Sequence, residues 1–410
     1  MKLLILTQYF PPEIGAPQNR LFELAVRLKQ KGVEVTVFTA MPNYPQMEVH
    51  ATYKGKFYSY EEMDGLHVHR SWIYVSKSKS IFKRLLNYFS FVKTSFLAGW
   101  FKLGKFDYIL CESPPIFLGI TAYLLKKIKG AKLIFNVSDL WPESAEKLGL
   151  VTNKFFLRSA TKLEEFLYRK SDLICGQTQG IVKNISIRFP DKKVYWLPNG
   201  VDLNYYKPDG IKSNWRDKNN FLPDDFILLY AGIIGHAQGL EVVIYAADKL
   251  KEHSKIKFVL LGSGPEKEKL QKLKQDLKVQ NVFFFDPVSK KEMPGIVSSI
   301  DLAVIPLKRL DLFKGAIPSK IFENLAMKKP ILLGVEGEAK ELFIDEGKCG
   351  LAFTPDDAAD LCVKTLELYN SKDLLKQLGE NGFKYVEQKF TRDKIANDFW
   401  NFINEKLDKF

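Results

Sequence analysis

Short apolar runs alternate with amphipathic stretches along almost the whole chain, and this alternation constrains the fold more than any other feature. Residues 3–6 read as a buried strand, residues 21–28 carry leucine and alanine at helical spacing, and residues 33–38 alternate as a second strand. Strands and helices that alternate in this way predict a parallel sheet with helices on its faces. The other runs that read as strands are 108–111, 132–137, 173–175, 194–197, 226–230, 257–261, 282–285, 302–305, 331–333 and 351–353.

The length of the chain predicts about two domains, because 410 residues are more than a single domain with one hydrophobic core usually contains. A turn-rich stretch at 198–208 marks the junction. We therefore expect an α/β protein with two doubly wound, Rossmann-like domains, 1–203 and 204–388, facing a central cleft that collects the loops beyond the carboxyl ends of the strands. Residues 389–410 are predicted to form a helix that crosses back to the first domain.

The sequence shows no feature of an exported or membrane-spanning chain. No run of about 18 uninterrupted apolar residues is present, and the amino terminus enters a strand pattern without a basic start or a cleavage site. We therefore expect a cytoplasmic protein. Cysteines without paired spacing are predicted to be reduced core residues, and these are Cys111, Cys175, Cys349 and Cys362.

Residues 65–106, which we call the basic aromatic segment, contribute much of the net charge of +13 and contain no acidic residue. Basic side chains interleaved with aromatic ones suit the headgroups of an anionic membrane, so we predict a peripheral contact with the inner face of the cell membrane. The alternative is that the aromatic groups face the core and the lysines only solvate the surface. Nucleic acid is not expected as a partner, because no recognition motif accompanies the charge. The basic residues are Arg70, Lys77, Lys79, Lys83, Arg84, Lys93, Lys102 and Lys105.

The stretch 315–330 places a lysine and a carboxylate at what reads as the start of a helix. Ser319 could cap this helix, and the free N–H groups of its first turn favour an anion. Lys320 adds a positive charge, while Glu323 lies one turn later on the same side and could accept hydrogen bonds from two sugar hydroxyls. A site that can bind both a phosphate and two neighbouring sugar hydroxyls indicates a nucleotide ligand. The alternative is an ordinary amphipathic helix in which both side chains are solvated.

Three glycine-rich turns each follow a strand and precede a helix, as phosphate-binding and ribose-binding loops do. Gly15 lies in the first, before a helix expected to begin near Asn19. Each turn alone is a weak signal, because glycine turns follow strands in many folds. The full set of residues predicted to bind this nucleotide is Gly15, Gly235, Gln238, Gly239, Gly262, Gly264, Pro265, Ser319, Lys320 and Glu323.

A loop of the first domain carries candidate residues for the opposite side of the predicted cleft, where a second substrate, the acceptor, or a sugar would lie. Asp139, Trp141 and Glu143 follow one strand, and Ser113 follows the preceding strand in the same way. Asp139 could accept a proton or a hydrogen bond from an acceptor hydroxyl, although an aspartate here also fits a simple turn.

The absence of several motifs narrows the chemistry. The chain has no Asp-x-Asp pair, and His67 and His69 alternate along a probable strand without a third ligand nearby, so we expect no bound metal and no cofactor. Lysine, helix dipoles and glycine-turn N–H groups must then neutralise a diphosphate. No GxSxG elbow, GxxxxGK[ST] loop or thiol with a matched base is present.

Several segments occur in a recognisable order: FPPEIGAPQNR, NVSDLWPES, LPNGVD, AGIIGHAQGLE, GSGP, PSKIFENLAMKKP and GEAKEL…CG. Together they resemble the retaining glycosyltransferases of family 4, which have the GT-B fold, and the likeness covers nearly the whole chain. Within that family, SDLWPES and AGIIGHAQGLE look most like the bacterial L-fucosamine (N-acetyl-L-fucosaminyl) transferases of O-antigen and capsule assembly.

The resemblance implies a metal-independent hexosyltransferase that works with retention. Its donor would be UDP-N-acetyl-L-fucosamine or a related N-acetylated deoxyhexose, and its acceptor a lipid-linked saccharide. Gly15 would lie against the phosphate, and Glu323 matches the second carboxylate of the family's Glu-x7-Glu motif, expected on the ribose. Gly315 stands where the first carboxylate belongs. Asp139 occupies the loop in which many relatives keep a histidine.

The second glycine turn, GIIGHAQG, lacks the arginine and lysine that hold the diphosphate in many relatives. Lys320 is therefore expected to neutralise a larger share of the negative charge of the diphosphate. The predicted catalytic residues are Lys320 and Asp139. His236 in this turn could touch phosphate or sugar, or face solvent. Three cations of a neighbouring loop could assist, namely Lys308, Arg309 and Lys314.

Two other functions stay open at this point. A GT-B epimerase of nucleotide sugars would need an acid and a base around the sugar, for which Asp139 and Glu143 are the candidates, and it would convert donor without acceptor. A non-catalytic basic protein that binds membrane or nucleic acid would show no saturable site for UDP.

Overall fold

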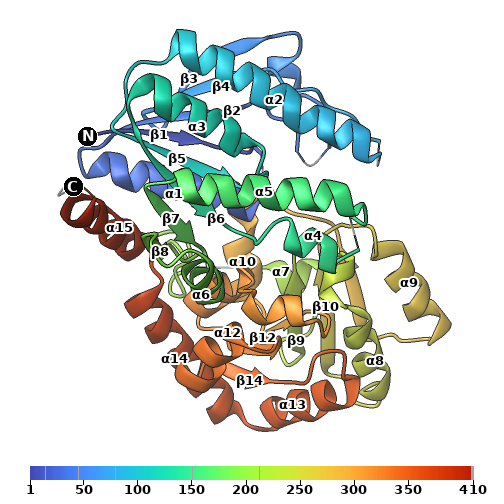
Figure 1. Ribbon diagram of the computed structural model, residues 1–410. Coiled ribbons are helices and arrows are strands. Elements are labelled where there is room, and N and C mark those ends of the chain that lie inside the picture. The colour runs from blue at the N-terminus through green and yellow to red at the C-terminus, as the bar shows by residue number, and fades with distance from the viewer. Residues whose placement is uncertain (14, 45, 79, 150, 212, 408–410) are drawn as a thin grey trace. The chain divides into compact units, whose positions relative to one another are not determined.

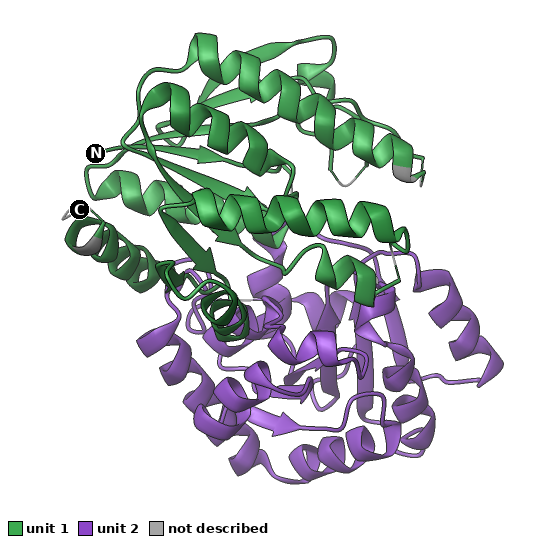
Figure 2. Cartoon of the chain, in the orientation of Figure 1, with its two compact units in different colours: residues 1–199, 392–410 green, residues 200–391 purple. Residues whose placement is uncertain are grey.

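The computed structural model describes residues 1–410 except 14, 45, 79, 150, 212 and 408–410 (Figure 1). The chain forms two compact units, of which unit 1 comprises Met1–Asn199 with the segment from Arg392 onward, and unit 2 comprises Gly200–Thr391 (Figure 2). The sequence predicted the boundary after residue 203, and the units divide after Asn199.

Unit 1 contains an eight-stranded sheet with the order β3-β4-β2-β1-β5-β6-β7-β8. All neighbouring strands are parallel except β3 and β4. The strands are β1 Lys2–Leu6, β2 Glu34–Ala40, β3 Tyr58–Met63, β4 Leu66–Ser71, β5 Tyr108–Ser113, β6 Lys132–Val137, β7 Leu173–Gly176 and β8 Val194–Trp196.

Helices cover both faces of this sheet, because alternate residues of each buried strand point to opposite sides. Leu4 and Leu6 of β1 belong to one core with α2, α3 and α5, whereas Leu3 and Ile5 belong to another with α1 and α15. The helices are α1 Ala16–Gln30, α2 Ile81–Lys102, α3 Leu118–Lys129, α4 Glu143–Lys147, α5 Lys154–Lys170, α6 Gln179–Arg188 and α15 Arg392–Lys406. Helix α1 begins at Ala16 rather than near Asn19, so that prediction was wrong by about one turn.

The hairpin formed by β3 and β4 was not predicted, although its turn carries a recognisable signal. Asp64 and Gly65 both have positive φ, 49° and 72°, as a two-residue hairpin turn of type I′ requires. An Asp-Gly pair between two alternating stretches is a strong sequence indicator of such a turn. His67 and His69 do lie on a strand, β4.

Unit 2 contains a six-stranded, all-parallel sheet with the order β11-β10-β9-β12-β13-β14. Its strands are β9 Phe226–Ala231, β10 Ile256–Leu261, β11 Val282–Phe285, β12 Leu302–Pro306, β13 Ile331–Gly334 and β14 Gly350–Ala352. Its helices are α7 Trp215–Lys218, α8 Glu241–Lys249, α9 Lys267–Asp276, α10 Met293–Ser298, α11 Lys320–Ala326, α12 Glu338–Lys340, α13 Ala358–Asn370 and α14 Lys372–Lys389. The predicted α/β class with two parallel-sheet units is confirmed.

Two further sequence expectations concern the described residues. The four cysteines are buried and form no disulfide within the described part. None of the helices in the described ranges is both long and apolar enough to cross a membrane.

Candidate functional site

Lys320 lies beyond the carboxyl ends of the strands of unit 2, over the ring of Tyr230. Lys320 is the first residue of the seven-residue helix α11, and Tyr230 belongs to β9. The Nζ atom lies 4.4 Å from the ring centroid and donates a hydrogen bond to the tyrosine Oη at 3.3 Å. The Tyr230 hydroxyl in turn donates to the carbonyl of Ile233 at 2.6 Å. The ammonium is therefore seated on a buried aromatic group at the edge where open α/β sheets bind ligands.

Burial controls the charge state of this lysine. Desolvation is the largest cause and lowers the pKa of Lys320 to about 8, while the nearby carboxylate of Glu323 raises it. The ammonium is thus mostly charged at neutral pH but partly desolvated, which strengthens its attraction for an anion. Glu323 follows Lys320 by three residues on α11, a spacing at which helical side chains are neighbours.

Ser319 does not cap this helix, and the prediction that it does was wrong. Its backbone angles, φ −59° and ψ −28°, are helical, and its side chain makes no capping bond. A capping residue needs an extended backbone so that its side chain can turn back to the first N–H groups. The N–H groups of Ile321 and Phe322 instead donate to the carbonyls of Pro318 and Ser319, at 3.1 and 3.2 Å.

The glycines after β9 and β10 have a packing role that needs no ligand. A Cβ added at Gly262 would overlap the carbonyl oxygen of Gly232, and one at Gly264 would overlap that of Ile234. Main-chain bonds join the two loops, from Gly232 N to Leu261 O at 2.9 Å and from Ile234 N to Ser263 O at 2.8 Å. Pro265 follows as an exposed residue.

The turn after β9 is the short helix η2 (His236–Gln238), which Gly235 and Gly239 flank. Lys308 follows β12 and lies against this turn. Its main-chain N–H donates to Ala237 O at 2.9 Å, and its Nζ lies 3.1 and 3.2 Å from the two ring nitrogens of His236.

The other two candidate cations of the Lys308 loop each pair with a carboxylate. Arg309 Nε lies 3.5 Å from a Glu336 carboxylate oxygen, and Lys314 Nζ lies 2.8 Å from Asp311. Of the three, Lys308 is the one that the structure places against the glycine turn after β9. Gly315, at the position of the missing carboxylate, ends η4 (Asp311–Gly315).

In unit 1, the loop after β6 places its candidate residues in local contacts. Asp139 accepts a hydrogen bond from Ser144 Oγ at 2.7 Å, and burial raises the pKa of its carboxyl group. Trp141 packs edge-on against two phenylalanines of the core, and Glu143 pairs with Lys147 at 2.6 Å. The structure thus places all three side chains in contacts within unit 1, and Ser144 holds the Asp139 carboxylate.

Gly15 and Ser113 lie at other carboxyl ends of the same sheet. Gly15 precedes α1 with an extended backbone, and a Cβ there would overlap the side-chain oxygen of Gln18. Gln18 is buried, and its Oε1 has no partner among the described residues. Ser113 is buried, and its carbonyl accepts from Ser138 N at 2.8 Å.

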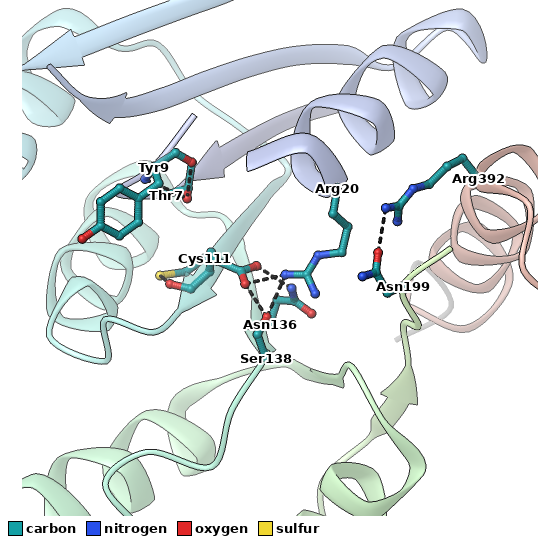
Figure 3. A network of polar contacts seen from close by, with 9 residues as sticks. Thr7, Tyr9, Arg20, Cys111, Asn136, Ser138, Asn199 and Arg392 are labelled. Atoms are coloured by element: carbon teal, nitrogen blue, oxygen red, sulfur yellow. Dashed lines mark hydrogen bonds and ion pairs between the residues drawn. The ribbon is translucent and has the colours of Figure 1, made fainter. Parts of the chain in front are cut away.

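A buried ion pair that the sequence interpretation missed contacts Ser138, the residue before Asp139 (Figure 3). Arg20 Nη2 donates to Glu112 Oε1 at 2.5 Å and to Ser138 Oγ at 2.7 Å, and Asn136 Nδ2 donates to the other carboxylate oxygen at 2.6 Å. The two side chains are only 6% and 3% exposed. The available signal was Glu112 itself, a charge inside an otherwise apolar strand, because such a charge is rarely buried without a partner.

A second buried arginine holds the start of α15 to unit 1. Arg392 donates to Asn199 Oδ1 at 2.6 Å and to Glu23 at 2.8 Å, and burial lowers the pKa of its guanidinium to about 10. Figure 3 shows Arg392 and Asn199 directed at each other.

The basic aromatic segment divides into a buried and an exposed part. Arg70 is fully buried and pairs with Glu61 at 2.5 Å, so its assignment to a basic surface was wrong. Lys77 pairs with Glu48 at 3.4 Å, and Lys79 lies outside the described residues. The other five cations are exposed, namely Lys83, Arg84, Lys93, Lys102 and Lys105.

No group of three or more histidine, cysteine, aspartate or glutamate side chains that could hold a metal ion occurs within the described ranges.

Two family models match the chain, one on each half. The model "Glycosyltransferase Family 4" matches residues 18–205, and the model "Glycosyl transferases group 1" matches residues 211–385. Among curated proteins, the colanic acid biosynthesis glycosyl transferase WcaI of Escherichia coli K12 is 29% identical over 80% of this chain and 81% of its own length. The O-antigen chain mannosyltransferase C of Escherichia coli is 20% identical over 98% and 97%.

Solved structures share the architecture at low sequence identity. Sucrose-phosphate synthase of Thermosynechococcus elongatus matches with a TM-score of 0.78 and 16% identity, and both chains are covered completely. Anabaena HepE, solved in complex with UDP and glucose, matches with a TM-score of 0.71 and 16% identity over 98% of this chain and 99% of its own. The two family matches and the shared architecture identify the chain as a family 4 glycosyltransferase with the GT-B fold.

Proposed function

We propose that this glycosyltransferase moves a sugar, with retention, from a UDP-sugar to a lipid-linked saccharide during surface polysaccharide synthesis. The observation that carries the proposal is the partly desolvated ammonium of Lys320, held on Tyr230 with Glu323 near it, beyond the carboxyl ends of the unit 2 strands. Relatives named for colanic acid and O-antigen synthesis, and the UDP in the HepE structure, support the polysaccharide and the donor. The sugar proposed from the sequence motifs is N-acetyl-L-fucosamine or a related N-acetylated deoxyhexose, which makes the enzyme a hexosyltransferase.

In this proposal, Lys320 and Lys308 stabilise the negative charge that develops on the leaving diphosphate, and Glu323 accepts hydrogen bonds from the ribose hydroxyls. The bond between the anomeric carbon and the phosphate oxygen breaks, and the acceptor oxygen bonds to the same face of the sugar. The acceptor hydroxyl passes its proton to the departing phosphate oxygen, so no enzyme nucleophile is required. Asp139 is proposed to accept a hydrogen bond from the acceptor.

A panel of nucleotide sugars tests the donor. UDP-sugars are expected to raise the melting temperature by a few degrees at millimolar concentration, because a ligand of the native state stabilises it by mass action. GDP-sugars are expected to produce no such shift, and a preference for GDP-sugars would contradict the proposal. Conversion of the donor sugar without acceptor would instead indicate an epimerase.

Removal of divalent cations tests the role of lysine. Because Lys320 and Lys308 carry the charge that a metal would otherwise supply, excess EDTA is expected to leave the initial rate within about twofold of the untreated enzyme. Loss of activity on chelation, restored by added Mg²⁺ or Mn²⁺, would show that the lysines are insufficient.

Helix α2 supports a further element of the proposal, a peripheral contact with an anionic membrane. Phe82, Leu86, Phe89, Leu97 and Trp100 are 41–69% exposed. Their spacing of three, four or eight residues places them along one side of the helix. The five exposed cations of the segment lie on or just beyond α2, and the segment has no acidic residue. An exposed apolar side with basic neighbours suits an interfacial helix.

Vesicle binding tests this contact. Replacing Phe89 and Trp100 by glutamate is expected to weaken binding to phosphatidylglycerol vesicles at least tenfold, because it removes apolar area and adds repulsion. Transfer to a water-soluble acceptor is expected to stay unchanged. Phe155→Glu, at an exposed phenylalanine of α5, is the matched control. Equal binding by all three proteins would contradict the membrane contact.

A further inference from the structure

We propose that Tyr230 is the positioning residue of Lys320, and that its ring and hydroxyl oxygen together hold the ammonium where the diphosphate of the donor binds. This inference rests on the proposed role of Lys320 in donor binding. Neither Tyr230 nor its contact with Lys320 follows from the sequence motifs, because the two residues are 90 positions apart.

The hydrogen bonds of Tyr230 fix which way its hydroxyl group points. A phenol has one proton to donate, and here the carbonyl of Ile233 receives it at 2.6 Å. The oxygen must then present a lone pair to Lys320 Nζ, which lies 3.3 Å away and has protons to donate. The hydroxyl thus acts as an acceptor for the ammonium and also joins β9 to the loop that follows it.

The ring supplies the second contact, and its position is rigid. Tyr230 is fully buried in β9, in register with Leu260 of β10. The ring centroid lies 4.4 Å from Nζ, a distance at which the negative face of the ring attracts a cation. Gly232 lies close to the same ammonium, since a Cβ added there would be 3.2 Å from Nζ. The ammonium therefore has one well-defined place, which favours a preorganised charge over a mobile one.

Tyr230 can hold the ammonium of Lys320 while its own side chain stays neutral. Burial raises the pKa of its phenol, so it stays neutral across the working pH range. Tyr230 from β9 and Glu323 from α11 are the titratable groups that act on Lys320 in the described part of the chain. The ring, the hydroxyl oxygen and Glu323 favour the charged form of Lys320, against the desolvation that disfavours it. Removing the tyrosine is therefore expected to lower the pKa of Lys320 further.

Two substitutions test the inference. Tyr230→Met fills the space but removes both the ring and the oxygen, and it is expected to lower kcat/KM about tenfold to hundredfold. Tyr230→Phe keeps the ring and is expected to lose less than about tenfold. In both, the alkaline limb of the pH profile of kcat/KM should move to lower pH, more for Met than for Phe. Tyr385→Phe is the control, because it removes a buried hydroxyl elsewhere in unit 2, one that donates to Glu346.

Calorimetry with UDP provides a readout that does not depend on turnover. A bound diphosphate raises the pKa of Lys320, so UDP binding at pH 8 takes up protons, and buffers of different ionisation enthalpy reveal how many. Both Tyr230 variants should take up more protons than the wild type. A wild type without saturable UDP binding would overturn the proposed function instead. Wild-type UDP binding with unchanged pH profile and proton uptake in the Phe variant would overturn the role of Tyr230, even if the Met variant does not fold.

Discussion

Replacing Lys320 by methionine is expected to lower kcat/KM by about a thousandfold while raising the melting temperature by roughly 5 °C. The rate falls because the variant lacks the ammonium that is proposed to stabilise the charge of the leaving diphosphate. Stability rises because burial lowers the pKa of this lysine to about 8, which means that the fold bears a desolvation penalty for keeping it charged. A methionine of similar length fills the same space without that penalty, as expected where function and stability conflict.

The pH dependence of stability gives the same prediction an independent check. The pKa of Lys320 in the folded protein, about 8, lies below the ordinary value of about 10.4 in the unfolded chain. Between these values the unfolded chain binds more protons, so this group makes stability rise with pH there, and its penalty is complete below pH 8. The rise in folding stability over this pH range should be smaller in the Lys320→Met variant.

An exposed lysine serves as the matched control. Lys376→Met, on α14, is expected to change neither the rate nor the melting temperature appreciably. Near-normal transfer by Lys320→Met would remove Lys320 from the mechanism. A melting temperature well below that of the wild type would show that the ammonium contributes to the fold rather than strains it.

The strands were predictable because buried parallel strands read as continuous apolar runs. Strands β6 and β11 have the predicted bounds, Lys132–Val137 and Val282–Phe285. Strand β3 was missed because it lies at the edge of its sheet and carries a half-exposed, polar sequence, YSYEEM. Its turn, Asp64-Gly65, was the better indicator.

In the candidate site too, contacts between residues close in the sequence were predictable, and contacts between distant residues were not. The proximity of Glu323 to Lys320 on one helix follows from their three-residue spacing, so the sequence predicts it. The failure of Ser319 to cap depends on backbone angles that the residue type does not determine. The seat on Tyr230 and the pair of Arg20 with Glu112 join residues 90 and 92 positions apart, and no local periodicity encodes such contacts.

Glu112→Leu is expected to destabilise unit 1 by about 3–5 kcal/mol and to lower its melting temperature by about 10 °C. The glutamate accepts hydrogen bonds from Arg20, Asn136 and Ser138, and almost none of its surface is exposed. Without it, the guanidinium stays buried without its counter-charge, and two further donors lose their acceptor. Glu165→Leu, which breaks an exposed pair with Arg169, is the control and should cost less than about 1 kcal/mol.

The double variant Arg20→Met/Glu112→Leu separates stability from function at this position. Two apolar side chains leave no buried charge, so most of the lost stability should return. Activity should not return with it, because Ser138 loses both of its side-chain partners and Asp139 follows directly in the same loop. We expect kcat/KM to stay about tenfold below the wild type at a near-normal melting temperature. Full recovery of both would mean that the pair only supports the fold, whereas recovery of stability alone would make it the anchor of the Asp139 loop.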